Sequence, residues 1–147
     1  MTVLVELSNF CVRSQSRVLV ENVNLSLSAG EVTALVGPSG SGKSLTARAC
    51  MGVLDVDPGI QAGQLVYPEW HAGHDWFASV VGLGMRAQRK LMRQTRQIRG
   101  SQITYSPQSA SSALNPARTI GRQLQLSIGR RVHAPSDLGN EIKESFK

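Results

Sequence analysis

The chain has 147 residues, a net charge of +6 and 41% hydrophobic residues, which suits at most one ordinary soluble globular domain. No apolar run approaches the roughly 18 residues that cross a bilayer, and the N-terminus lacks the basic start and apolar core of a signal peptide. A membrane span and a secreted precursor are therefore not expected, and we expect a cytoplasmic protein. Its two cysteines, Cys11 and Cys50, lack metal-ligand spacing. In a reducing compartment we expect no disulfide, and we expect Cys50, within a predicted helix, to be a buried thiol.

The first elements expected along the chain are β-strands. Residues 3–7 are mostly apolar and predict one strand. Apolar and polar residues alternate over 23–28, which predicts a half-buried strand. Ala29-Gly30 then leads into the apolar stretch 31–36. We expect an antiparallel hairpin between 23–28 and 31–36, with the second strand buried on both faces.

A phosphate-binding motif follows directly. Residues 37–44 read GPSGSGKS and match G-x-x-x-x-G-K-[ST] without a mismatch. The glycines let the backbone curl so that its N–H groups form an anion nest, at the start of a helix predicted over 43–54. Lys43 is expected to reach the β- and γ-phosphates, and the Ser44 hydroxyl suits a Mg²⁺ ligand. The predicted nucleotide-binding residues are Gly37, Pro38, Ser39, Gly40, Ser41, Gly42, Lys43, Ser44 and Leu45.

The middle of the chain carries two weaker signals. A short strand at 63–67 precedes a predicted loop over 68–84, in which His71, His74 and Asp75 resemble a set of metal ligands. Because no further ligand lies nearby in the sequence, this pattern favours an ordinary surface loop. From 86 to 99 the chain has six basic residues and no acidic one, mostly on one helical face. A nucleic-acid or anionic-lipid surface is one interpretation, but without interleaved aromatics the pattern favours a solvated face or a contact with acidic partners.

The last third of the chain predicts a short strand and two helices. Residues 103–105 are strand-like, and a loop follows over 107–116. Apolar residues recur every fourth position over 119–128, which predicts a helix. A second such stripe runs over 136–147 without a stop signal, so we expect this chain to be the first part of a longer design.

With these motifs in place, the chain resembles the ATP-binding subunit of an ABC transporter, most closely in the peptide and nickel importer branch. Residues 28–48 around the phosphate loop carry the resemblance, together with Gln108 and the Leu114-Asn115-Pro116 that follows it, which resemble the Q-loop. The resemblance implies an α/β fold. Its P-loop NTPase core would have an N-terminal antiparallel β-hairpin and an incomplete sheet over 1–118, followed at 119–147 by the start of a helical subdomain.

The resemblance also implies cofactors and partners. Residues 37–44 would hold the triphosphate of ATP, and Ser44 and Gln108 would complete the Mg²⁺ shell. The partners would be integral membrane permease subunits and a second ATP-binding subunit, at the cytoplasmic face of the inner (plasma) membrane, and no nucleic acid is expected. The family stacks adenine on an aromatic residue of the first hairpin. Cys11 stands at the matching position, and we expect its neighbour Phe10 to lie in the core.

The sequence departs from this family in one important respect. It contains no L-S-G-G-Q signature and no apolar strand ending in Asp-Glu, so the residue that orients water is missing. We therefore expect a truncated importer motor that binds nucleotide, hydrolyses it negligibly alone and is poorly stable, because its sheet has exposed edges. Two alternatives remain. One is a small-molecule kinase of the P-loop class, which phosphotransfer to a metabolite would reveal. The other is a basic nucleic-acid-binding protein, which steep salt dependence would reveal.

Overall fold

The computed structural model of the protein describes residues 2–71, 73–107 and 114–128. They belong to two units, Met1–Arg96 and Gln97–Lys147. The elements are β1 (Val3–Ser14), β2 (Val18–Ser28), α1 (Lys43–Ala49), β3 (Pro58–Val66), α2 (Gly84–Gln94), the 3₁₀ helix η1 (Thr95–Gln97) and α4 (Ile120–Ile128).

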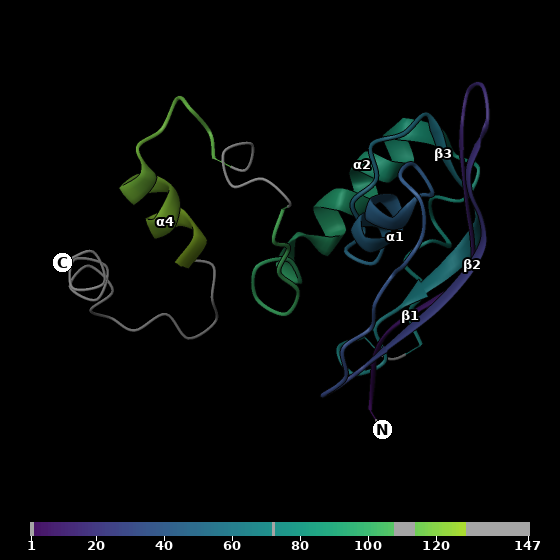
Figure 1. The fold of residues 1–147 in the computed structure, drawn as a ribbon, viewed down its shortest axis with the longest axis horizontal. Helices are drawn as coiled ribbons and strands as arrows, with labels where there is room; N and C mark the ends of the chain where they lie inside the picture. Colours follow the sequence, from purple (N-terminus) through teal and green to yellow (C-terminus); the bar gives the residue numbers. More distant parts are fainter. Residues whose placement is uncertain (1, 72, 108–113, 129–147) are drawn as a thin grey trace. The chain divides into compact units, whose positions relative to one another are not determined.

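The first unit is built on a three-stranded antiparallel sheet with the order β2-β1-β3 (Figure 1). β1 and β2 form a hairpin whose turn is closed by a hydrogen bond from Ser14 N to Arg17 O, 2.9 Å. The N-terminal antiparallel hairpin that the resemblance implies is thus confirmed, and it joins β1 to β2. The strands predicted at 3–7 and 23–28 lie within longer strands, and the strand predicted at 63–67 lies within β3 except for Tyr67.

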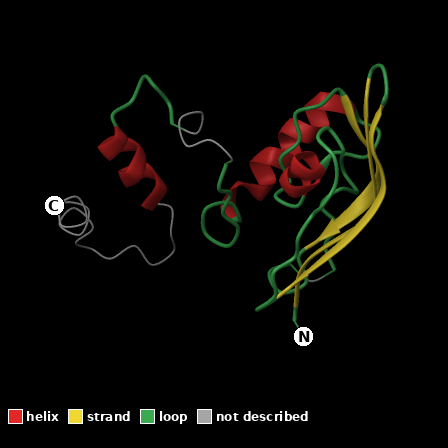
Figure 2. Ribbon diagram, viewed as in Figure 1, coloured by secondary structure: helices red, strands yellow, loops and turns green. Residues whose placement is uncertain are grey.

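The core of this unit lies between the sheet and the helices, since α1 and α2 are on one side of the sheet (Figure 2). Phe10 of β1 is fully buried, and its ring lies 5.7 Å from that of Phe77, as expected for a core residue. α2 is joined to the start of β3 by the buried amide of Gln88. Its Nε2 donates hydrogen bonds to Val56 O at 3.0 Å and Pro58 O at 3.1 Å. Burial and these bonds together hold α2 against the sheet.

The segment 31–36 differs from its prediction. It forms no strand, and Val32 and Val36 are 100% and 92% exposed. The predicted hairpin with 23–28 is therefore wrong, and so is the predicted burial on both faces. The physical reason is that a strand buried on both faces needs a hydrogen-bonded neighbour on each side and layers above and below. No strand in the described part of the chain pairs with 31–36.

Two further predicted elements are shorter in the structure. α1 ends at Ala49, followed by turns in which Cys50 N donates to Thr46 O and Gly52 N to Ala49 O. The predicted helix over 43–54 is therefore correct in its start and too long at its end. The predicted strand at 103–105 is reduced to a single bridge between Arg99 and Ile103, so that prediction is wrong. A strand needs a run of hydrogen-bonded pairs with a neighbouring strand, and here only one pair forms.

In the second unit, α4 confirms the helix predicted over 119–128. The Asn115 preceding it is held by Gln123 of α4. Asn115 N donates to Gln123 Oε1 at 2.8 Å, and Gln123 Nε2 donates to Asn115 O at 3.1 Å. The Leu-Asn-Pro turn is thereby attached to the first turns of α4. The helix predicted at 136–147 lies outside the described residues.

The two cysteines differ in their surroundings. Both are free thiols: Cys50 is only 5% exposed, whereas Cys11 is half-buried. Desolvation by burial raises the pKa of the Cys50 thiol to about 11, with a smaller opposing effect from a backbone N–H that donates to the sulfur. A raised pKa keeps Cys50 in the unreactive protonated form at neutral pH.

We expect a thiol reagent at neutral pH to modify Cys11 and to spare Cys50 in the folded chain. Peptide mass spectrometry after a short exposure to iodoacetamide would measure both sites. In denaturant the two thiols should react alike, which provides the control. Equal labelling of both in the folded chain would contradict the burial of Cys50.

Candidate nucleotide-binding site

The phosphate loop is positioned by its contact with β2. Gly42 caps α1 in the left-handed conformation, with φ of 88°, and Thr46 N donates the first helical hydrogen bond to Gly42 O at 2.8 Å. A Cβ at Gly42 would lie 2.6 Å from Val20 Cγ2 and 3.1 Å from Leu19 O. Only glycine satisfies both the conformation and the close approach. Val20 and Leu19 therefore support the loop from behind.

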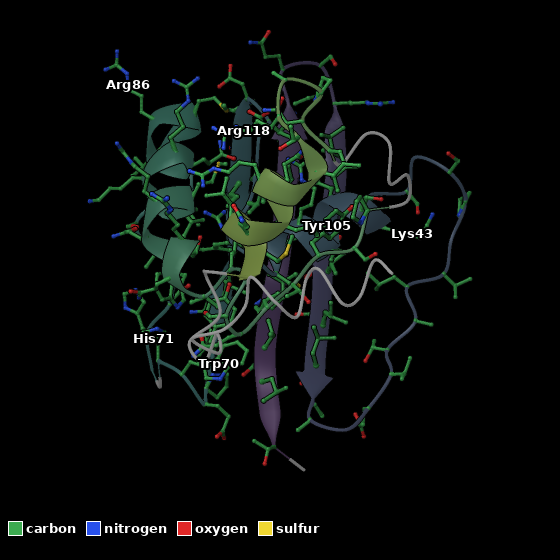
Figure 3. The ribbon with its side chains drawn as sticks, turned by 90° about the vertical axis from the view of Figure 1, so that its left-hand side faces the viewer. Lys43, Trp70, His71, Arg86, Tyr105 and Arg118 are labelled. Atoms are coloured by element: carbon green, nitrogen blue, oxygen red, sulfur yellow. The ribbon has the colours of Figure 1, made fainter. Side chains whose placement is uncertain are left out.

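Lys43 folds back onto its own loop. Its ammonium donates to Gly37 O at 2.8 Å, to Pro38 O at 2.7 Å and, more weakly, to Ser41 Oγ at 3.4 Å. These three acceptors match the three donors of a lysine ammonium. Figure 3 labels Lys43 beside α1, at the side of the unit where this loop lies. The positive charge is thus held within the loop, where an anion entering the loop would meet it.

The backbone donors at the start of α1 are the second feature of the site. The N–H groups of Gly42, Lys43, Ser44 and Leu45 have no acceptor among the described residues. Unsatisfied donors of this kind at the first turn of a helix, next to a lysine ammonium, suit phosphate oxygens. The exposed Ser44 hydroxyl adjoins them. These donors suit the phosphates of a nucleoside triphosphate, and the Ser44 hydroxyl oxygen suits the Mg²⁺ ion that accompanies them.

All the predicted nucleotide-binding residues lie in the phosphate loop and the start of α1, whereas one predicted Mg²⁺ ligand does not. The structure brings residues 37–45 together in one exposed or half-exposed loop and helix start. Gln108, the other predicted Mg²⁺ ligand, lies outside the described residues. The contribution of Val20 and Leu19 was not predicted, because they are far from the motif in sequence and only the fold brings them to Gly42.

The candidate metal ligands His71, His74 and Asp75 make hydrogen bonds or ring contacts with neighbouring residues. The Asp75 carboxylate accepts hydrogen bonds from Leu65 N at 3.1 Å and Phe77 N at 2.9 Å. His71 and His74 pack edge-on against the ring of Trp76, with centroid distances of 5.2 and 4.8 Å. These contacts give each of His71, His74 and Asp75 a packing or hydrogen-bonding role. No group of three or more metal-ligating side chains occurs in the part of the chain that was described.

Within the same described ranges, none of the helices has the length and apolar character needed to cross a membrane.

Comparison with known proteins identifies the family. Residues 20–145 match the ABC transporter family. The glutathione import ATP-binding protein GsiA of Escherichia coli O1:K1 / APEC is 37% identical over 114 residues, which are 78% of this chain and 16% of GsiA. The GsiA of Shigella flexneri serotype 5b (strain 8401) gives the same values. The zinc import ATP-binding protein ZnuC of Rhizobium meliloti (strain 1021) is 52% identical over 56 residues, which are 38% of this chain and 18% of ZnuC.

The matched part of this chain corresponds to less than a fifth of the length of these curated relatives. The family match covers well over half of the chain and includes the phosphate loop at 37–44. The chain therefore belongs to the ABC transporter family.

Proposed function

We propose that this chain is the nucleotide-binding part of an ATP-binding subunit of an ABC importer for peptides, nickel or a similar small solute. The observation that carries the proposal is the loop at 37–45. It combines a lysine ammonium held by Gly37 O and Pro38 O with a row of unsatisfied N–H groups. Family membership and similarity to proteins named as import ATP-binding proteins support the transport role.

Each part of the site has its own proposed task. The N–H groups at the start of α1 bind phosphate oxygens, while Lys43 exchanges its carbonyl partners for the β- and γ-phosphates. Ser44 and Gln108 bind Mg²⁺, which neutralises charge on the phosphates when it is bound. The sequence contains no apolar stretch ending in Asp-Glu, the pattern that would supply a carboxylate to orient a water molecule. We therefore propose that it binds nucleotide without turning it over alone.

The partners follow from the transport role. We propose that the protein works with integral membrane permease subunits and a second ATP-binding subunit, at the cytoplasmic face of the membrane. GsiA is named for glutathione import, and glutathione is a small peptide-like solute. GsiA matches a larger part of this chain than the zinc importer subunit ZnuC does, so we favour a peptide-like solute over a metal ion.

A competition experiment with the full chain tests the nucleotide site. A fluorescent ATP analogue is bound in the presence of Mg²⁺ and displaced by ATP, ADP or AMP. We expect ATP and ADP to compete and AMP to compete far more weakly, because AMP offers Lys43 no β-phosphate. AMP competing as well as ATP would exclude the proposed arrangement of the phosphates.

Phosphate release from the same protein tests the absence of turnover. We expect the rate to equal that of the Lys43→Ala variant, since general-base assistance worth about 10²–10⁴-fold is missing. Rapid release that the Lys43→Ala variant lacks would show that a hydrolytic residue lies within this chain. Transfer of phosphate to an added metabolite would instead favour a kinase.

A further inference from the structure

The outer face of α2 carries a row of cations that the nucleotide site does not use. Arg86, Arg89, Lys90 and Arg93 of α2, with Arg96 of η1, are all exposed, and we call them the α2 basic strip. At 3.6 residues per turn the four residues of α2 fall within an arc of roughly 100°. Figure 3 shows Arg86 extending from α2 away from the sheet. The strip is therefore a continuous surface of one charge sign.

The opposite face of α2 fixes this surface in place. Gln88, Leu91 and Thr95 are buried, and Thr95 Oγ1 donates to Leu91 O at 3.0 Å. Because the apolar side of the helix is already packed in the core, α2 cannot insert into an apolar partner. Apart from Gln94, the exposed side chains of α2 are all positively charged.

The charge of the strip is not balanced nearby. No ion pair is formed by the strip residues within the described ranges, and the sequence has no acidic residue between Asp75 and Asp137. The Asp75 carboxylate is already engaged by Leu65 N and Phe77 N. Four like charges on α2 and a fifth on the adjoining η1 create a positive potential that attracts a polyanion.

We propose that the α2 basic strip docks on the anionic phospholipid surface of a membrane. Four of the five side chains are arginines, whose guanidinium groups bind phosphate in a bidentate manner. The strip contains no aromatic residue on which nucleic-acid bases could stack, which disfavours single-stranded nucleic acid. Leu83, 65% exposed just before α2, adds an apolar side chain beside the cations. The choice of a membrane as the occupant rests on the proposed transport function.

Binding of the full chain to lipid vesicles, without nucleotide, tests this inference. The vesicles are phosphatidylcholine with one third phosphatidylglycerol, and phosphatidylcholine alone serves as the neutral reference. We expect binding only to the anionic vesicles, with affinity falling as salt rises. Each cation near an anionic surface contributes about fivefold in affinity. The triple variant R86Q/R89Q/R93Q should therefore bind about 100-fold more weakly.

Two matched variants distinguish binding by the α2 basic strip from the general attraction of a positively charged protein to an anionic membrane. R13Q/R17Q/R122Q removes the same charge from exposed arginines elsewhere and should lose only a few-fold. In a second triple variant, lysine replaces arginine at the three strip positions, and it should retain most of the binding. Far-ultraviolet circular dichroism checks that all variants fold alike.

Three results would overturn the proposal. The first is an equal loss of vesicle binding in R86Q/R89Q/R93Q and in R13Q/R17Q/R122Q. The second is the absence of binding to anionic vesicles at low salt. The third is strip-dependent binding to duplex DNA that exceeds binding to the vesicles. Because no nucleotide is present, a failed vesicle assay leaves the outcome of the ATP competition experiment unaffected. The proposed nucleotide site and the proposed membrane surface can thus fail separately.

Discussion

Replacing Lys43 with alanine is expected to weaken binding of Mg-ATP by about 10- to 150-fold. The substitution removes an ammonium that the structure holds between Gly37 O and Pro38 O, at 2.8 and 2.7 Å. Hydrogen bonds to charged groups are worth about 1.5–3 kcal/mol, which corresponds to this range of affinity. Titration of the fluorescent nucleotide against the parent and the variant measures the effect.

Lys90→Ala provides the matched control for this experiment. Lys90 is an exposed lysine on α2, so its removal lowers the net charge by the same amount. We expect Lys90→Ala to bind Mg-ATP as the parent does. If Lys43→Ala binds as tightly as Lys90→Ala, the loop at 37–44 does not bind the phosphates in the way we propose.

Replacing Gly42 with alanine is expected to destabilise the fold more than any other glycine-to-alanine change in the loop. A non-glycine residue at φ 88° costs about 1–3 kcal/mol. The added methyl would also lie 2.6 Å from Val20 Cγ2 and 3.1 Å from Leu19 O, and overpacking of this kind costs about 1–3 kcal/mol more. The free energy of unfolding in urea measures the sum.

Gly40→Ala separates the two contributions. Gly40 also has a positive φ, 79°, but a Cβ there would meet nothing within 4 Å. We expect Gly40→Ala to show the conformational cost alone. The double variant Gly42→Ala/Val20→Ala should be more stable than additivity predicts, since shortening Val20 makes room for the new methyl. A Gly42→Ala variant no less stable than Gly40→Ala would mean that β2 does not support the loop.

The positions of the sheet's strands, though not their pairing, could be predicted from sequence because the signals of a strand are local. Alternation over 23–28 marks a strand whose two faces differ in burial, and that pattern is present whatever the rest of the chain does. The same holds for α4, where the apolar positions repeat every fourth residue. The length of β3 was underestimated because the turn residues Pro58 and Gly59 lie within the strand.

The segment 31–36 shows where sequence patterns fail. Its apolar composition indicates burial on both faces, but burial is a property of the neighbours and not of the segment. Without a paired strand on either side in the described part of the chain, Val32 and Val36 lie exposed. Composition therefore reports what environment a strand would suit, not whether that environment is present.

The sequence by itself determined the family motif, the loop at 37–44 and its chemistry, because the pattern of glycines, lysine and serine is contiguous and each residue acts through its own backbone or side chain. Only the tertiary structure decided how that loop is supported and how Lys43 is held. It placed Val20 against Gly42, turned the ammonium onto two loop carbonyls and directed the basic residues of α2 outwards. The Lys43 contacts are local, but the support of Gly42 by Val20 and the attachment of Gln88 to Val56 and Pro58 join residues far apart in the chain. Such contacts form only when the sheet and helices pack together.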